Sequence, residues 1–165
     1  MLTKDQKKNY IAEMSFTGSL NAGKAIFAFN PNKPEYNNAS PYVQNCTNFI
    51  PNSIGMKIDG SKSIGLTKSM VVDSYTQYNQ GGIGVSITNE GYAQLVSLFT
   101  ICDEVAIFCG SGSACDLTNS NSSFGTFYWI KEISSSRTEI RLASQVLSNT
   151  IILNAFSQYQ NYVTT

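Results

Sequence analysis

The chain has 165 residues, of which 42% are hydrophobic and 13% are charged, and its 11 basic residues balance its 11 acidic ones. This length and hydrophobic content predict one domain, residues 1–165, with a real core, and they exclude global disorder. Because no excess of positive charge is available to neutralise phosphates, we expect no nucleic-acid partner.

Neutral polar residues replace charge at the surface. Serine, threonine, asparagine and glutamine together supply 58 of the 165 residues. A protein with net charge near zero has little electrostatic repulsion between its copies, which favours association. The composition therefore points toward contacts with other proteins or with further copies of the chain.

Several kinds of chemistry are excluded by composition alone. The chain contains no histidine, so it cannot hold a Ser-His-Asp or Cys-His catalytic group or a histidine-dependent metal site. No serine is followed by a lysine three positions later, which removes the common Ser-Lys signature. We therefore predict no metal and no cofactor, and we leave the question of an enzyme open while favouring a non-catalytic protein.

The N-terminal third predicts a helix, a strand and a loop. Residues 3–15 have the apolar spacing of a short amphipathic helix, residues 24–31 read as a strand that ends at Asn30-Pro31, and residues 30–41 read as a long surface loop. Lys4, Lys7 and Lys8 are followed by no apolar run, so we expect no secretory signal. The chain is then either a cytoplasmic product or already processed, and its location stays unknown. It contains no apolar run of transmembrane length.

The central part mixes predicted strands with one predicted helix. Strands are expected at 42–50 and 81–88, and Asp59-Gly60 between two apolar segments predicts a β-hairpin. Residues 89–100 are expected to form a helix, because Tyr92, Leu95 and Phe99 recur at helical spacing after a capping residue.

The C-terminal part predicts two strands and a long helix. Strands are expected at 104–108 and 124–133. Residues 135–163 favour a long C-terminal helix, although 138–146 alternates well enough to begin as a strand. No internal repeat stands out. The resulting prediction is an α+β fold with an antiparallel or mixed sheet.

A glycine-rich turn in the segment 104–117 imitates a dinucleotide-binding loop. Gly110 and Gly112 follow an apolar strand, but Cys115 stands where the third glycine is needed, and no helix follows. Phosphate binding here is therefore disfavoured. Cys109 and Cys115 bracket the turn and are candidates for a disulfide, and the alternative is that all the cysteines are small buried thiols. No pair shows the C-x-x-C spacing of zinc or redox motifs.

An aromatic and amide-rich cluster is the best candidate for ligand binding. Tyr75, Gln77, Tyr78 and Asn79 lie within residues 73–82, and such side chains stack on and hydrogen-bond neutral polar ligands such as sugars. The competing interpretation, which we favour for the segment alone, is a strand end followed by a Gly-Gly turn.

These observations predict a non-catalytic structural or interaction protein, most simply a self-assembling subunit of a capsid, filament or similar assembly. Its expected partner is another copy of itself or another protein. The first alternative is a lectin- or adhesin-like module that binds neutral glycans. The second alternative is a hydrolase that uses carboxylates without histidine.

Overall fold

The computed structural model describes residues 10–21, 23–29, 42–62, 69–132, 139–142, 146–148 and 151–155. Strands make up 64% of the described structure and helix only 2%. The helical part is one short turn, η2 (Gly60–Lys62). The α+β fold class predicted from the sequence is therefore wrong, and the described chain is a β protein.

The strands form two sheets, and within each sheet every described pair of neighbouring strands is parallel. Sheet A contains β1 (Tyr10–Ala12), β2 (Ser15–Phe16), β4 (Tyr42–Asn48), β6 (Ser69–Tyr78), β8 (Tyr92–Ile101), β10 (Ala114–Thr118), β11 (Ser120–Ser123), β13 (Glu139–Leu142) and β14 (Val146–Ser148). Sheet B contains β3 (Ala25–Phe29), β5 (Ile54–Asp59), β7 (Ile83–Thr88), β9 (Val105–Cys109), β12 (Phe127–Glu132) and β15 (Ile151–Ala155).

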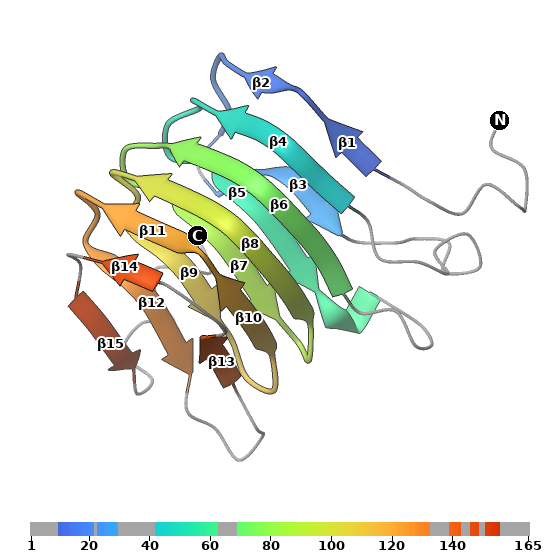
Figure 1. The fold of residues 1–165 in the computed structure, drawn as a ribbon, viewed down its shortest axis with the longest axis vertical. Helices are drawn as coiled ribbons and strands as arrows, with labels where there is room; N and C mark the ends of the chain where they lie inside the picture. The colour runs from blue at the N-terminus through green and yellow to red at the C-terminus, as the bar shows by residue number, and fades with distance from the viewer. Residues whose placement is uncertain are drawn as a thin grey trace, which may run out of the picture.

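The chain alternates between the two sheets, and each sheet adds its strands in chain order (Figure 1). The chain therefore winds as a parallel β-solenoid. We call one turn of this winding a rung, and each rung contributes first to sheet A and then to sheet B. Equivalent positions are Val43, Val72, Leu95 and Leu117, which lie 29, 23 and 22 residues apart and pair in register. This unequal spacing explains why no repeat stands out in the sequence.

None of the three predicted helices forms in the described residues. Residues 92–100 of the helix predicted at 89–100 belong to β8, and the described parts of the predicted C-terminal helix form β13, β14 and β15. The sheet is parallel, not antiparallel or mixed. The hairpin at Asp59-Gly60 is also absent, because β5 belongs to sheet B and pairs with β3 and β7, whereas β6 belongs to sheet A.

The remaining strand predictions agree better with the structure. The strands expected at 24–31, 42–50, 81–88, 104–108 and 124–133 correspond to β3, β4, β7, β9 and β12. Residues 10–12 of the predicted N-terminal helix form β1, and residues 3–9 lie outside the described residues. The loop expected at 30–41 also lies outside them.

A column of residues with left-handed backbone divides sheet A into two facets. Asn45, Ser74, Ser97 and Asn119 all have positive φ angles, and the strand pairing skips them in β4, β6 and β8. Facet A1 contains residues 42–44, 71–73, 92–96 and 114–118, and facet A2 contains residues 46–48, 75–78, 98–101 and 120–123. Such a residue acts as a bulge, so it bends the strand and reverses which side chains face inward.

The helix predicted at 89–100 is wrong because its marker residues do not share a face: Leu95 is buried, whereas Phe99 is 40% exposed. The shift of one residue also gives β8 a helix-like interval. Leu95 and Leu98 both face the core although they are three residues apart, because Ser97 between them adopts a φ of 52°. A regular strand would place inward residues at even spacing. The interval of three imitates the apolar spacing of a helix, and the same interval separates Val43 from Cys46 and Val72 from Tyr75.

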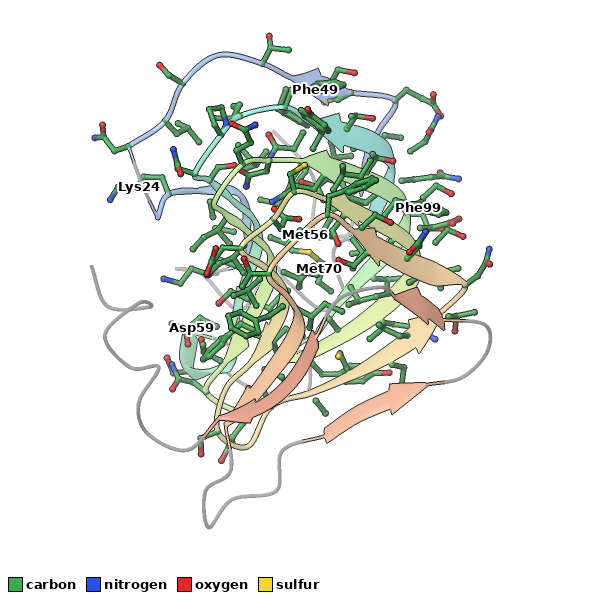
Figure 2. All side chains as sticks on the ribbon, turned by 90° about the vertical axis from the view of Figure 1, so that its left-hand side faces the viewer. Lys24, Phe49, Met56, Asp59, Met70 and Phe99 are labelled. Atoms are coloured by element: carbon green, nitrogen blue, oxygen red, sulfur yellow. The ribbon has the colours of Figure 1, made fainter. Side chains whose placement is uncertain are left out.

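The core lies between the sheets and is built from stacked columns of apolar side chains. Val43, Val72, Leu95 and Leu117 form one column on sheet A, and Met56, Val85 and Ile107 form another on sheet B. Figure 2 shows Met56 and Met70 in the interior, in keeping with their near-complete burial.

Small residues on sheet B leave room for larger side chains from sheet A. Gly55, Gly84 and Ala106 lie in successive rungs. A Cβ on Gly55 would lie 2.0 Å from Gln77 Oε1 and 2.7 Å from the Tyr75 hydroxyl. The glycine is thus required because buried polar groups of facet A2 pack directly against the sheet B backbone.

We predict that Gly55→Ala lowers the free energy of unfolding by about 2–4 kcal/mol, because the new methyl group displaces hydrogen-bonded buried side chains. Urea denaturation measures the loss. Lys57→Ala, an exposed position on the same strand, should change stability by less than about 0.5 kcal/mol. Equal stability of Gly55→Ala and wild type would contradict this packing.

Candidate functional site

The predicted binding segment lies at the end of β6, and its side chains separate into two groups. Tyr75, Gln77 and Asn79 are at most 1% exposed, whereas Tyr78 is 45% exposed. Alternation along the strand places the first three inside the solenoid and Tyr78 outside. The segment therefore belongs to two features, an interior polar network and an outer aromatic surface. The strand end and Gly-Gly turn that the sequence favoured for this segment agree with the structure, in which β6 ends at Tyr78.

The interior feature is a ladder of polar side chains that crosses the rungs of facet A2. Asn48, Gln77, Thr100 and Ser122 occupy equivalent positions in four successive rungs and are each at most 1% exposed. We call these four residues the polar ladder. Buried polar groups are costly unless they are hydrogen-bonded, and within the ladder Asn48 and Gln77 bond to each other, whereas Thr100 Oγ1 is buried without a partner.

Gln77 is the centre of this network. Its Nε2 donates to the Ile83 carbonyl at 2.9 Å and to Asp103 Oδ1 at 2.9 Å. Its Oε1 accepts from Asn48 Nδ2 at 3.2 Å and from the Tyr75 hydroxyl at 2.9 Å. One amide thereby joins β4, β6, β7 and the turn after β8.

Asn48 and Asn79 connect the same network to the turn between β4 and β5. Asn48 Nδ2 also donates to Ser53 Oγ at 2.9 Å, and Asn48 Oδ1 accepts from the Ile50 amide at 3.0 Å. Asn79 Nδ2 donates to the Ser53 carbonyl at 2.8 Å. These bonds hold the chain where it passes from facet A2 to sheet B.

Two titratable groups of the network are perturbed by burial. Burial raises the pKa of the Asp103 carboxyl well above its usual range, and hydrogen bonds from Gln77 and Asn79 offset this only in part. Burial and the nearby Asp103 also raise the pKa of Tyr75 well above its usual value. Burial therefore favours the neutral form of both groups.

The outer feature is a group of exposed aromatic rings on facet A2 and its border. We call Phe49, Tyr78, Phe99 and Phe124 the aromatic row. Their exposed fractions are 47%, 45%, 40% and 79%. Phe49 and Tyr78 are in contact, with ring centroids 6.5 Å apart and planes tilted by 48°. Figure 2 shows Phe49 and Phe99 outside the core that holds Met56.

The described strands of facet A2 carry no charged side chain. Register places Thr47, Thr76, Phe99 and Asn121 in one outward column and Tyr78, Ile101 and Ser123 in the next. None of these positions carries a charged side chain. Sequence reasoning found Tyr78 but missed the three phenylalanines. Successive rings of the aromatic row lie 21 to 29 residues apart in sequence, and only the rung register brings them to neighbouring positions.

Facet A1 differs from facet A2 because its outer face carries carboxylates. The Tyr42 hydroxyl donates to Asp73 Oδ2 at 3.1 Å, and the Tyr92 hydroxyl donates to Asp116 Oδ2. In both pairs the tyrosine bonds to the following rung, so these carboxylates connect rungs. Of the two adjacent acids that follow β8, Asp103 is buried, whereas the half-buried Glu104 accepts from Thr126 Oγ1 at 3.0 Å.

The glycine-rich segment 104–117 contains β9, the turn at residues 110–113 and most of β10. Cys109 and Cys115 are both fully buried thiols. Cys115 stands in the inward column of Met70 and Ala93, and Cys109 in that of Ile58 and Ile87. Both therefore occupy positions filled by apolar residues in other rungs, and a disulfide between them stays a prediction for oxidised protein.

We predict that Gln77→Leu lowers the free energy of unfolding by about 3 kcal/mol or more, because it leaves several buried partners without a hydrogen bond at about 1–3 kcal/mol each. Thermal and urea unfolding measure the effect. Gln94→Leu, on the exposed side of facet A1, is the matched control and should stay within about 0.5 kcal/mol of wild type. Similar losses in the two variants would contradict the role assigned to the polar ladder.

The described residues contain no group of three or more acidic or cysteine side chains arranged to hold a metal ion. Within the same residues, no helix is long and apolar enough to cross a membrane.

Comparison of the chain with protein-family models, with curated proteins and with solved structures finds no match in any of the three. The function is therefore argued from the geometry of the two features described above.

Proposed function

We propose that the chain is a non-catalytic structural domain that associates with further copies of itself through the aromatic row. The observation that carries this proposal is the set of four exposed rings on a facet without charge. Two copies can bury such a surface without stripping water from ions, which is the costly part of forming an interface.

The size of the surface supports an interface of modest strength. If a whole aromatic side chain offers about 200 Å², the exposed fractions amount to roughly 400 Å² on one copy. A standard interface buries about 800 Å² on each partner, so the aromatic row supplies about half of it. We therefore expect association that depends on concentration in the micromolar range.

Two features favour a second copy over a neutral glycan as the occupant. Three of the four rings are phenylalanines, which lack a hydroxyl group to bond to a sugar. The tilt of 48° between Phe49 and Tyr78 also prevents these two rings from forming one flat platform for a sugar ring. Apolar rings set at an angle instead suit interdigitation with the side chains of another protein surface.

We predict that the wild-type chain sediments as a species heavier than 18.0 kDa at micromolar concentration. The double variant Phe99→Ser and Phe124→Ser should sediment as a monomer, because it removes two apolar anchors of the interface. The matched control is Gln44→Ser with Gln94→Ser on facet A1, which should associate like wild type. Circular dichroism confirms that all three proteins are folded.

A wild-type chain that stays monomeric at millimolar concentration would contradict self-association. If that monomer binds neutral glycans on an array and Tyr78→Ala abolishes the binding, the glycan-binding alternative replaces the proposal. Equal association of the aromatic variant and the facet A1 variant would also contradict it, since the interface would then lie elsewhere.

A further inference from the structure

The turns that connect facet A2 to sheet B stack on one another and enclose a buried carboxyl group. Val105 N donates to the Gly82 carbonyl at 3.2 Å, and Thr126 N donates to the Asp103 carbonyl at 3.1 Å. The Asp103 side chain points inward and is 1% exposed as a residue. It therefore lies where three successive rungs meet, away from solvent.

Two oxygen atoms at this place lack hydrogen bonds. Asp103 Oδ1 accepts from Gln77 Nε2 at 2.9 Å, but Asp103 Oδ2 has no partner although it is buried. Asn79 Oδ1 is likewise buried without a partner, whereas the Asn79 side chain acts on the Asp103 carboxyl as a donor, which lowers its pKa and offsets part of the effect of burial. The orientation of Asn79 is fixed, because its Nδ2 donates to the Ser53 carbonyl.

An ionised carboxylate accepts hydrogen bonds at both oxygens, and the Asp103 carboxyl has a close partner at only one of them. A protonated carboxyl group carries no charge and offers one O–H donor. A proton on Asp103 Oδ2 therefore removes a buried negative charge that would otherwise destabilise the fold.

No cation is available to stabilise an ionised Asp103. The described segments that pack around it, residues 46–55, 75–85, 98–105 and 123–127, contain no lysine or arginine, and the chain has no histidine. The titratable groups of these segments are Cys46 on β4, Tyr75 on β6, and Cys102 and Glu104 beside Asp103. None of these side chains can carry a positive charge, so none of them stabilises a negative charge on Asp103.

We propose that Asp103 is held in the folded chain as the neutral carboxylic acid, with its proton on Oδ2, and that loss of this proton destabilises the fold. In that step the Asp103 O–H bond breaks, the proton passes to solvent water, and the carboxylate is left buried without a counter-ion in the described segments around it. The protonated form of Asp103 therefore favours the folded chain, and the ionised form weakens it.

The direction of the pH dependence follows from the raised pKa of Asp103 in the folded state. Above the unfolded pKa, near 4, the unfolded chain loses this proton while the folded chain keeps it. As pH rises, the unfolding constant therefore increases by up to tenfold for each pH unit, until the pKa of the folded state is reached. The stabilising contribution is complete below the unfolded pKa and is lost as pH rises.

The test compares wild type with Asp103→Asn, which keeps the acceptor for Gln77 and replaces the O–H donor by an N–H donor. Urea unfolding is measured from pH 4.5 to pH 9. The ratio of wild-type to variant unfolding constants should rise by up to tenfold per pH unit in this range. Glu104→Gln, at the next position, should keep the wild-type pH dependence.

A ratio that does not change with pH would overturn the proposal, because Asp103 would then have the same pKa in both states. If Asp103→Asn does not fold, carbon-13 NMR of labelled aspartate carboxyls in the wild type gives the answer. One of the five aspartates should titrate well above pH 5, and ordinary titration of all five would overturn the proposal equally.

Discussion

The structure depends on the parallel register between successive rungs. Each rung repeats the same order of inward apolar residue, left-handed residue and inward polar residue, so that like groups stack on like. The backbone pairing places the members of the polar ladder one rung apart, within reach of one another. The same register gathers the outer aromatic rings on one facet. Interior stability and surface chemistry therefore have a common origin.

The polar ladder makes this register specific. An apolar side chain tolerates a small shift along its column, whereas the Gln77 amide has bonding partners on β4, β7 and the turn after β8. A slip of one residue would move these groups to the outside and leave their partners unpaired. Gly55 and Gly84 belong to the same constraint, since only a hydrogen in place of Cβ leaves space for the ladder. Together they fix how the two sheets meet.

Sequence reasoning identified strands well where a short apolar run was bounded by turn residues, as in β7 and β9, but it wrongly predicted a helix for β8. Tyr92, Leu95 and Phe99 recur there at helical spacing, yet Leu95 is buried and Phe99 is 40% exposed, so they do not share a face. Unequal rung lengths concealed the repeat. For the site, sequence reasoning found Tyr78, but Tyr75, Gln77 and Asn79 proved to be interior residues. Nothing in the sequence indicates that the Asp103 side chain is buried, because its burial results from the neighbouring rungs.

The central claim is that the aromatic row is where copies of the chain meet. The most direct measurement is amide NMR of the wild-type protein over a hundredfold range of concentration. The account predicts shifts that change with concentration for residues 47–49, 76–78, 99–101 and 121–124, with facet A1 unaffected. Spectra that do not change with concentration, or changes centred on facet A1, would contradict it.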